Sequence, residues 1–394
     1  MKVLIVTQYF WPENFRINDL VLGLRERGHE VRVLTGIPNY SGGRFFKGYN
    51  FFGPLFEFYE GVRVFRVPLI PRGNGSRIRL VLNYFSFVFF ACLLGPLRRL
   101  GPIDLIFIYE PSPITVCLPA ILLRKIKSTP VMFWMQDLWP ESLSATGAVR
   151  SKKILKIVDI LVRFIYRGCD RILVQSRAFL ESVKRQGGDF SRILYFPNSA
   201  EELYQPMVVE PEAPEHIGMP EGFRVMFGGN IGVLKAAKIL KGYSDIHWVV
   251  IGDGRMRPWV EAQIRERGLA KTVHLLGRRP VEAMPRYFSL ADALLVTLRK
   301  EPIFELTIPS KIQSYLACAK PIIAAIDGEG ARIIEEAGAG LTCPSENSGA
   351  LAYAVLEMYR MPQSKRQTMG KHGRTYFNTH FEHKMLLDRL AKKS

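Results

Sequence analysis

The feature that most limits the possible folds is a repeated alternation of short, continuous apolar runs with longer segments of helical periodicity. Such runs are typical of strands buried on both faces of a parallel sheet. In the first half they cover residues 3–7, 31–34, 62–67, 105–109, 131–135, 172–175 and 193–196. In the second half they cover residues 224–227, 247–251, 272–275, 293–298, 321–325 and 340–342. The pattern predicts an α/β protein with doubly wound, Rossmann-like sheets.

The length and one change of composition predict two domains. A chain of 394 residues is long enough for about two domains, and residues 200–222 are rich in Glu, Pro and Gly, as linkers are. We expect a first domain over 1–205, a linker over 206–222 and a second domain over 223–375. The helical segment at 376–394 is a candidate to pack back on the first domain. Ligands of such sheets bind outside the carboxyl ends of the strands, so we expect the site in an interdomain cleft.

The charge is concentrated in the first half. The chain has a formal net charge of +18, and residues 1–200 hold 28 Lys and Arg against 14 Asp and Glu. Residues 201–394 hold 26 and 22. Such an asymmetry indicates an anionic partner: nucleic acid, a membrane surface or a phosphorylated substrate. Because zinc-finger spacings, a basic region with heptads and RNP-like aromatic motifs are all missing from the sequence, we do not expect nucleic acid.

Residues 80–97 form an uncharged apolar run flanked by Arg79 and Arg98. Its 18 residues are at the lower limit for a membrane span, which needs about 17–25. Asn83 and Ser86 lie inside the run, and Gly95-Pro96 ends it. Three interpretations stay open: a buried core helix, a partly exposed helix that contacts the membrane, and a span. A soluble or monotopic protein is favoured, and arginines beside an apolar surface suit an anionic bilayer.

Two further features bear on the compartment. The five cysteines are far apart and form no zinc or CxxC spacing, so we expect reduced thiols. No small-residue cleavage site follows the opening MKVLIVTQYF, so we expect no secretory signal.

Glycine-rich loops follow several predicted strands of the second half. Gly228-Gly229-Asn230-Ile231-Gly232 precedes a helical segment that contains Lys235, which suits a phosphate. A tight turn with a surface lysine is the alternative. Gly252-Asp253-Gly254 and Gly277-Arg278 occupy the same position after the next two runs, although Asp-Gly is also a common turn pair.

The segment from Glu305 to Ile323 has the richest pattern. A helix is predicted from Pro309 onward with Ser310 as its cap, so that the amides of Thr307 and Ile308 lie at a helix N-terminus, where a diphosphate is favoured. Lys311 in the first turn opposes the helix dipole, which an anionic ligand would explain. A solvent-facing lysine is the alternative.

In the first half, polar side chains follow two of the predicted strands. Gln136, Asp137 and Glu141 come after residues 131–135, together with Trp134 and Trp139. The loop after the first run contributes Trp11, Glu13, Asn14 and Arg16. We expect these side chains to line a polyol-binding cleft, with core packing as the alternative for the tryptophans.

Taken together, these motifs resemble retaining glycosyltransferases of family 4 with the GT-B fold, along essentially the whole chain. The resemblance rests on Tyr9-Phe10-Trp11-Pro12-Glu13, Leu24–Val31, Gln136-Asp137-Leu138-Trp139-Pro140-Glu141-Ser142, Pro197-Asn198, Gly228–Gly232, Val250–Gly254 and Pro309–Ala317. Within the family the chain is similar to bacterial enzymes of O-antigen and capsule assembly, including transferases of the fucosaminyl type.

The resemblance implies roles for individual residues. The second domain would bind the nucleotide sugar, with Lys235 and Lys311 on the leaving diphosphate, Glu305 on the donor sugar and Gln313 on the ribose. Asp137 would contact a sugar or acceptor hydroxyl in the first domain. The donor-binding set is Gly229, Asn230, Gly252, Asp253, Gly277, Arg278, Thr307, Ile308, Pro309, Ser310 and Gln313. The acceptor-side set is Trp11, Glu13, Asn14, Arg16, Gln136 and Glu141.

The chain departs from the family pattern at several positions. Gln313 stands where a second glutamate is usual, Asn230 where an arginine is usual, and Gln136 where a histidine is common. The Gly-Gly of the family's first loop is replaced around Glu13-Asn14. An Asp-x-Asp motif is missing from the sequence, in keeping with a metal-free mechanism.

The sequence therefore predicts a retaining, metal-independent glycosyltransferase without a cofactor. It would move a sugar, expected to be a UDP-linked N-acetylated or deoxy sugar, to a lipid-diphosphate-linked glycan in O-antigen, capsule or exopolysaccharide synthesis. We expect a cytoplasmic protein, peripheral on the inner face of the cell membrane and bound to its anionic lipids. Two alternatives stay open: a sugar-nucleotide 2-epimerase of GT-B-like fold, and a non-catalytic protein that binds sugar nucleotides.

Overall fold

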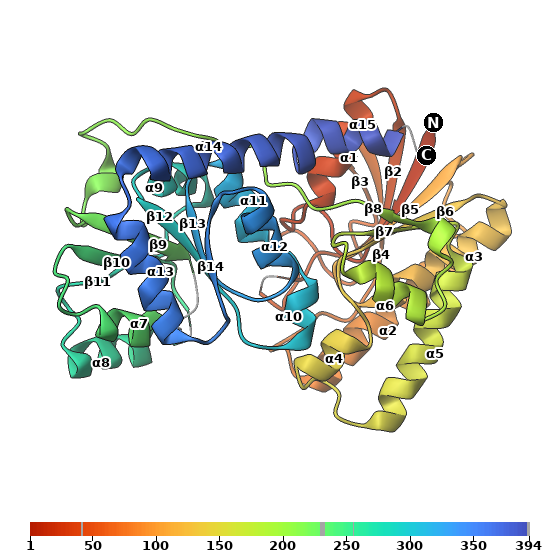
Figure 1. The fold of residues 1–394 in the computed structure, drawn as a ribbon. Coiled ribbons are helices and arrows are strands. Elements are labelled where there is room, and N and C mark those ends of the chain that lie inside the picture. The colour runs from red at the N-terminus through yellow and green to blue at the C-terminus, as the bar shows by residue number, and fades with distance from the viewer. Residues whose placement is uncertain (41, 229–232, 255, 392–394) are drawn as a thin grey trace. The chain divides into compact units, whose positions relative to one another are not determined.

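The computed structural model describes residues 1–40, 42–228, 233–254 and 256–391. The chain forms two compact units, one of Met1–Pro197 with Leu387–Ser394 and one of Asn198–Leu386 (Figure 1). Each unit holds a sheet of its own, with helices between most of its successive strands. The expected α/β architecture with two doubly wound, parallel sheets is confirmed.

The first unit contains an eight-stranded sheet in the order β3-β4-β2-β1-β5-β6-β7-β8. Its strands are β1 (Lys2–Val6), β2 (Glu30–Gly36), β3 (Phe56–Tyr59), β4 (Val62–Val67), β5 (Leu105–Glu110), β6 (Val131–Met135), β7 (Arg171–Val174) and β8 (Ile193–Tyr195). All neighbouring pairs are parallel except β3 with β4. The predicted strands of this half are confirmed to within a few residues, and β3 is an addition.

The helices of the first unit are α1 (Ile17–Glu26), α2 (Arg77–Leu94), α3 (Cys117–Lys127), α4 (Glu141–Ala145), α5 (Lys152–Gly168) and α6 (Phe179–Arg185). The connections that contain α2, α3 and α5 all advance in one direction along the sheet, from β4 to β7. Because such crossovers are right-handed, these helices cover the same face of the sheet. In agreement, α3 packs against both α2 and α5.

The second unit contains a six-stranded, all-parallel sheet in the order β11-β10-β9-β12-β13-β14. Its strands are β9 (Phe223–Gly228), β10 (Ile246–Ile251), β11 (Val273–Gly277), β12 (Ala293–Thr297), β13 (Ile322–Ala325) and β14 (Gly340–Cys343). Its helices are α7 (Val233–Ile239), α8 (Arg257–Arg267), α9 (Met284–Ser289), α10 (Pro302–Leu306), α11 (Ser310–Ala317), α12 (Glu329–Glu336), α13 (Ser348–Arg360) and α14 (Gln363–His380). The chain ends with α15 (His383–Ala391), in which Leu387 marks the return to the first unit.

Two apolar layers enclose the second sheet. Side chains of α7, α8 and α13 pack on one face, around Trp248 of β10. Side chains of α9, α11, α12 and α14 pack on the other face, around Leu294 of β12. The carboxyl ends of the strands therefore emerge between the first turns of helices from both layers.

The apolar run at residues 80–97 is not a buried core helix, so that interpretation is wrong. Within α2 only Asn83, Phe87 and Ala91 are buried, which is one residue per turn. Among the described residues one helix, α2, is long and apolar enough to cross a membrane, and only 17% of it is buried. One such helix is weak evidence for a span, but it shows that the run is an exposed apolar surface.

The unpredicted strand β3 is held by a buried ion pair. Arg66 of β4 is completely buried and pairs with Glu57 of β3. Its guanidinium also donates to the carbonyl oxygens of Gly36, at 2.9 Å, and Trp11. One side chain therefore joins the edge strand, the end of β2 and the loop after β1.

We predict that Arg66→Met lowers the free energy of unfolding by about 3–5 kcal/mol, because it leaves a partly buried carboxylate and two carbonyl groups without their partner. Urea denaturation measures this loss. Arg63→Met, on an exposed position of the same strand, is the control and should change stability by less than about 0.5 kcal/mol. Equal effects of the two substitutions would contradict the role of Arg66.

Candidate active site

At the carboxyl edge of the first sheet, a buried carboxylate joins the loops that follow β1 and β2. Glu13 accepts hydrogen bonds from the main-chain N–H groups of Asn39 at 2.6 Å, Tyr40 at 2.7 Å and Phe10 at 3.3 Å. Burial raises the pKa of Glu13 to about 7, although these hydrogen bonds and the charge of Arg66 oppose the rise. Glu13 was expected to face the acceptor, whereas the structure places it in the interior as the support of two loops.

The other predicted residues of the β1 loop lie nearer the surface. Asn14 is exposed, and Trp11 and Arg16 are half-buried. The ring of Trp11 stacks on Tyr59 with centroids 5.2 Å apart. These three side chains can contact a ligand; Glu13 holds their loop in place.

A second polar network fixes helix α2 to the same loops. The Asn83 amide accepts from Gln8 Nε2 at 2.8 Å and donates to the Asn39 side-chain oxygen at 3.1 Å and to the Ile70 carbonyl at 2.7 Å. The Ser86 hydroxyl accepts from the Ile70 N–H at 2.9 Å. The two polar residues of the apolar run thus bond to the body of the unit.

Sequence reasoning missed an aromatic and cationic cluster at this edge. The guanidinium of Arg72 lies over the rings of Tyr9, Tyr40 and Tyr84, at 5.7, 4.7 and 5.9 Å from their centroids. It also donates to the Tyr9 hydroxyl at 2.8 Å. Each tyrosine comes from a different segment, so only the fold reveals the cluster.

Glu110 is a second residue that sequence reasoning missed. It ends β5, is completely buried, and neither carboxyl oxygen has a hydrogen-bond partner within the described residues. Burial raises the pKa of Glu110 well above its usual range, and the nearby carboxyl of Asp137 raises it further, while the nearby main-chain N–H groups of Asp137 and Gln136 oppose the rise. The net shift favours the protonated form. The signal in the sequence was a glutamate that directly ends an apolar run.

Asp137 follows β6, the strand paired with β5. Burial raises the pKa of Asp137, and the nearby Ser142 hydroxyl and Trp139 indole partly offset the rise. Glu110 and Asp137 therefore form a pair of carboxyl groups in a poorly hydrated position. Such a pair can hold a proton near neutral pH.

The remaining predicted side chains of this loop are placed as follows. Gln136 is half-buried, and its main-chain carbonyl accepts from Gln175 Nε2 at 3.2 Å. Glu141 opens α4 and accepts from Gln186 Nε2 at 3.3 Å. Trp134 is buried and donates to the carbonyl of Phe196 at 3.1 Å, so the core-packing interpretation holds for it.

In the second unit, the first turns of α11 and α12 lie together at the carboxyl edge of the sheet. Gly330 of α12 approaches so closely that an added Cβ would lie 3.2 Å from Pro309 Cδ. Pro309 is the N-cap of α11, and no side chain caps the helix. Ser310 was expected to cap it and is instead the first helical residue, because Pro309 takes the N-cap position and the helix starts one residue earlier than a Ser310 cap would place it. The N–H of Thr307, which was expected at this helix start, instead donates to the Phe304 carbonyl at 3.3 Å and ends α10. The first-turn amides of α11 form a position suited to an anion.

Two charged side chains flank this helix start. Lys311 lies in the first turn of α11 with its side chain exposed, and partial desolvation lowers the pKa of its ammonium group. Glu305 lies in α10, half-buried. Gly328, with φ of 73°, touches α10: a Cβ there would lie 2.1 Å from the Glu305 carbonyl oxygen. Only glycine fits between the end of β13 and Glu305.

Gln313 is fully buried and donates from Nε2 to the carbonyl of Asn198 at 2.7 Å. This placement holds the start of the second unit and does not present the amide to a ribose. Ribose binding by Gln313 therefore stays a prediction that its position does not support.

The remaining donor-side residues are scattered among the loops. The N–H of Gly252 donates to the carbonyl of Gly277 at 2.9 Å, which joins the loops after β10 and β11. Asp253 and Arg278 are exposed beside them, and Lys235 is exposed on α7. Gly229 and Asn230 lie outside the described residues.

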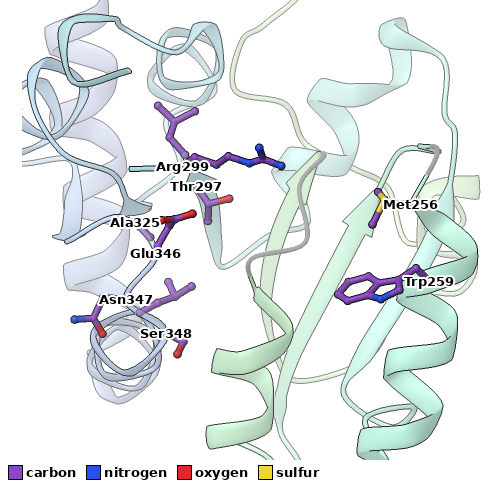
Figure 2. A pocket seen from close by; sticks show the side chains of 10 residues that line it. Met256, Trp259, Thr297, Arg299, Ala325, Glu346, Asn347 and Ser348 are labelled. Atoms are coloured by element: carbon purple, nitrogen blue, oxygen red, sulfur yellow. The ribbon is translucent and has the colours of Figure 1, made fainter. Parts of the chain in front are cut away.

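A pocket of about 310 Å³ opens at the same edge of the second sheet, on the side of α8 and α13 (Figure 2). Thr297 and Arg299 at the end of β12 and Glu346 and Ser348 at the start of α13 form one wall, opposite Trp259 of α8 (Figure 2). Of the predicted donor-binding residues that the structure describes, none lines it. In the described part of the chain no group of three His, Cys, Asp or Glu residues is placed to hold a metal ion.

Solved structures share this fold over the whole chain. HepE of Anabaena, solved in complex with UDP and glucose, aligns over 100% of this chain and 99% of its own, with a TM-score of 0.68 and 17% identity. An Escherichia coli trehalose-6-phosphate enzyme bound with UDP-2-fluoro glucose aligns over 100% and 98%, with a TM-score of 0.71 and 14% identity. Together with the two parallel sheets, these matches define the GT-B fold.

Sequence relatives give the activity. The chain is 29% identical to a probable glycosyltransferase, WbjE, of Pseudomonas aeruginosa, over 75% of this chain and 76% of the relative. It is 24% identical to WcaI, a putative colanic acid biosynthesis glycosyl transferase of Escherichia coli K12, over 80% and 81%. The protein is a glycosyltransferase of the GT-B fold. Residues 14–199 match the model of a glycosyl transferase 4-like domain, and residues 229–376 match that of glycosyl transferases group 1.

The buried carboxyl group of Glu110 predicts a free energy of unfolding that depends on pH. The pKa of Glu110 is higher in the folded chain than in the unfolded chain, where it is near 4.5. Above pH 4.5 the folded chain therefore keeps a proton that the unfolded chain releases, and the free energy of unfolding falls as the pH rises. We expect Glu110→Gln to remove this fall and to be more stable than the wild type at pH 7, but not at pH 4. Thermal unfolding between pH 4 and 8 measures it. The control Glu181→Gln, on an exposed residue, should follow the wild type; the same behaviour of Glu110→Gln would contradict a protonated Glu110.

The contact of Gly328 with α10 predicts a steric effect on Glu305. Gly328→Ala must move α10 and adopt an unfavourable φ, so we expect it to lower the free energy of unfolding by about 1–3 kcal/mol. Gly349→Ala, in the open first turn of α13, is the matched control and should be neutral or slightly stabilising. Denaturant unfolding distinguishes them, and a neutral Gly328→Ala would show that α10 is not constrained by this contact.

Proposed function

We propose that this enzyme is a retaining, metal-independent transferase that moves a sugar from a UDP-linked donor to a lipid-diphosphate-linked glycan at the inner face of the cell membrane. The observation that carries the proposal is the helix start at Ser310, with Lys311 in its first turn and Glu305 beside it at the carboxyl edge of the second sheet. Uncapped amides and one cation favour a diphosphate, and the carboxylate can accept hydrogen bonds from sugar hydroxyls.

The comparisons support the choice of substrates. HepE and the trehalose-6-phosphate enzyme were both solved with UDP or a UDP-sugar, and WcaI is assigned to colanic acid biosynthesis. We therefore place this enzyme in O-antigen, capsule or exopolysaccharide synthesis. An N-acetylated or deoxy sugar, as in fucosaminyl transfer, is the donor we propose.

The chemistry needs no group beyond the two substrates. The bond between the anomeric carbon and the diphosphate oxygen breaks while the acceptor oxygen bonds to the same face of that carbon, and the hydroxyl proton passes to the leaving phosphate. Configuration is thereby retained. Lys311, Lys235 and the amides at the start of α11 would stabilise the charge that develops on the diphosphate. Asp137 would orient the acceptor hydroxyl.

Helix α2 supports the proposed place at the membrane. It exposes Ile78, Phe85, Phe89 and Leu93, and arginines lie at both ends of the helix. Asn83 on the buried side and Ser86 at the border of the exposed side bond the helix to the body of the unit. We therefore propose that α2 lies along the membrane surface rather than across it, with its arginines at anionic headgroups.

We predict that Lys311→Ala lowers kcat by about 10²–10³-fold, the usual effect of removing one group that stabilises developing charge. Glu305→Ala should reduce transfer comparably while the chain stays folded. A panel of UDP-sugars with a lipid-diphosphate-linked acceptor, with and without EDTA, measures the rates. Lys238→Ala, on the exposed side of α7, is the control and should act as the wild type.

Wild-type rates in both site variants would refute the assigned site. Loss of transfer in EDTA would refute metal independence. Conversion of the UDP-sugar without an acceptor, with inversion at C2, would show an epimerase, and binding of the donor without any product would show a non-catalytic protein.

A further inference from the structure

Helix α5 has two apolar sides, of which only one is used by the fold. Val162, Ile165 and Tyr166 are buried against the unit. A second set, Ile154, Ile157, Ile160 and Phe164, is 49%, 65%, 60% and 49% exposed. At about 100° per residue, these four side chains fall within about a third of the helix circumference, on an arc that begins beside the buried set and turns away from it. They form a continuous exposed ridge.

The charges on α5 are arranged beside this ridge. Lys152, Lys153 and Lys156 are exposed in its first turns, and the acidic residue of the helix, Asp159, is paired with Arg163 at 2.8 Å. An apolar ridge with unpaired cations at one end matches an anionic lipid surface, which accepts apolar side chains and attracts lysine together.

Neighbouring elements of the same helical layer also expose apolar side chains. α2, α3 and α5 cover the same face of the sheet, with α3 packed against both neighbours. The intervening α3 exposes Ile126 between Lys125 and Lys127 at its end. The loop before β3 adds Phe52, which is 85% exposed and joins α2 through ring contacts of Phe51 with Phe52 and Phe90.

We propose that α5 is a second membrane-docking element, which lies in the plane of an anionic bilayer. Together with α2 it would attach the helical layer of the first unit to the bilayer along two separate helices. This inference rests on the proposed function for its setting and goes beyond it in assigning the contact to α5. Contact through two separate helices would prevent the first unit from tilting about either helix on the bilayer surface. The carboxyl edge that carries Asp137 would then keep one orientation toward a lipid-linked acceptor.

Vesicle binding tests the proposal independently of turnover. The full chain is sedimented with vesicles of phosphatidylcholine containing half phosphatidylglycerol. We expect Ile157→Gln with Ile160→Gln to weaken binding at least 10-fold, and Lys152→Gln with Lys153→Gln to weaken it about 5-fold per lysine at low salt. Val208→Gln with Ile217→Gln, exposed apolar residues of the second unit, is the control and should bind as the wild type.

A local probe separates α5 from α2. The fluorescence of the tryptophan introduced by Ile157→Trp should be quenched by brominated lipid in the vesicles, whereas that of Tyr353→Trp, at an exposed position of α13, should not. Vesicle binding that depends on Phe85→Gln with Phe89→Gln in α2 but not on the α5 variants would overturn the proposal. So would equal binding to vesicles of phosphatidylcholine alone, or a dimer in solution that the α5 substitutions dissociate. None of these outcomes depends on whether the proposed sugar transfer occurs.

Discussion

The arrangement of the first unit depends on one buried carboxylate. Where parallel strands end, the chain leaves the sheet and its main-chain N–H groups lose their partners. Glu13 supplies three of these partners at once, for the loops after β1 and β2. Asn83 in turn bonds helix α2 to the Asn39 side chain, and Arg66 pairs with Glu57 of the edge strand β3. The surface loops at this edge of the sheet are thus held by polar contacts that are themselves buried.

The sheet topology decides which surfaces remain for other contacts. Because the chain advances in one direction from β4 to β7, its connecting helices form a single layer, and α3 in the middle is the best covered. The outer helices α2 and α5 each keep an apolar side without a protein partner. The excess positive charge of this half lies in part around those sides. Composition, topology and exposure therefore indicate the same face.

Most of the fold could be predicted from the sequence, because buried parallel strands appear as short apolar runs between helical segments. The edge strand β3 could not, since half of its side chains face solvent and its stability comes from Arg66 and Glu57. The exposure of α2 could not be predicted either, because an apolar run is the same whether it faces a core or a lipid.

The site was predictable in part. The position of α11 after β12 and the polar loop after β6 followed from the strand pattern. The inward orientations of Glu13 and Gln313 did not, because polar residues near a predicted site satisfy main-chain groups as readily as ligands. Glu110 was overlooked because a glutamate at the end of a strand is usually solvated, and only the packed structure shows it enclosed.

The Asn83 contacts have a consequence for distance. Gln8 and Asn39, which bond to this side chain, follow β1 and β2 directly. The position of α2 is therefore fixed relative to the carboxyl edge of the first sheet by a few short hydrogen bonds. If α2 lies on a membrane as proposed, these bonds also fix the height of that edge above the lipid, and with it the distance from the lipid at which an acceptor hydroxyl can be bound.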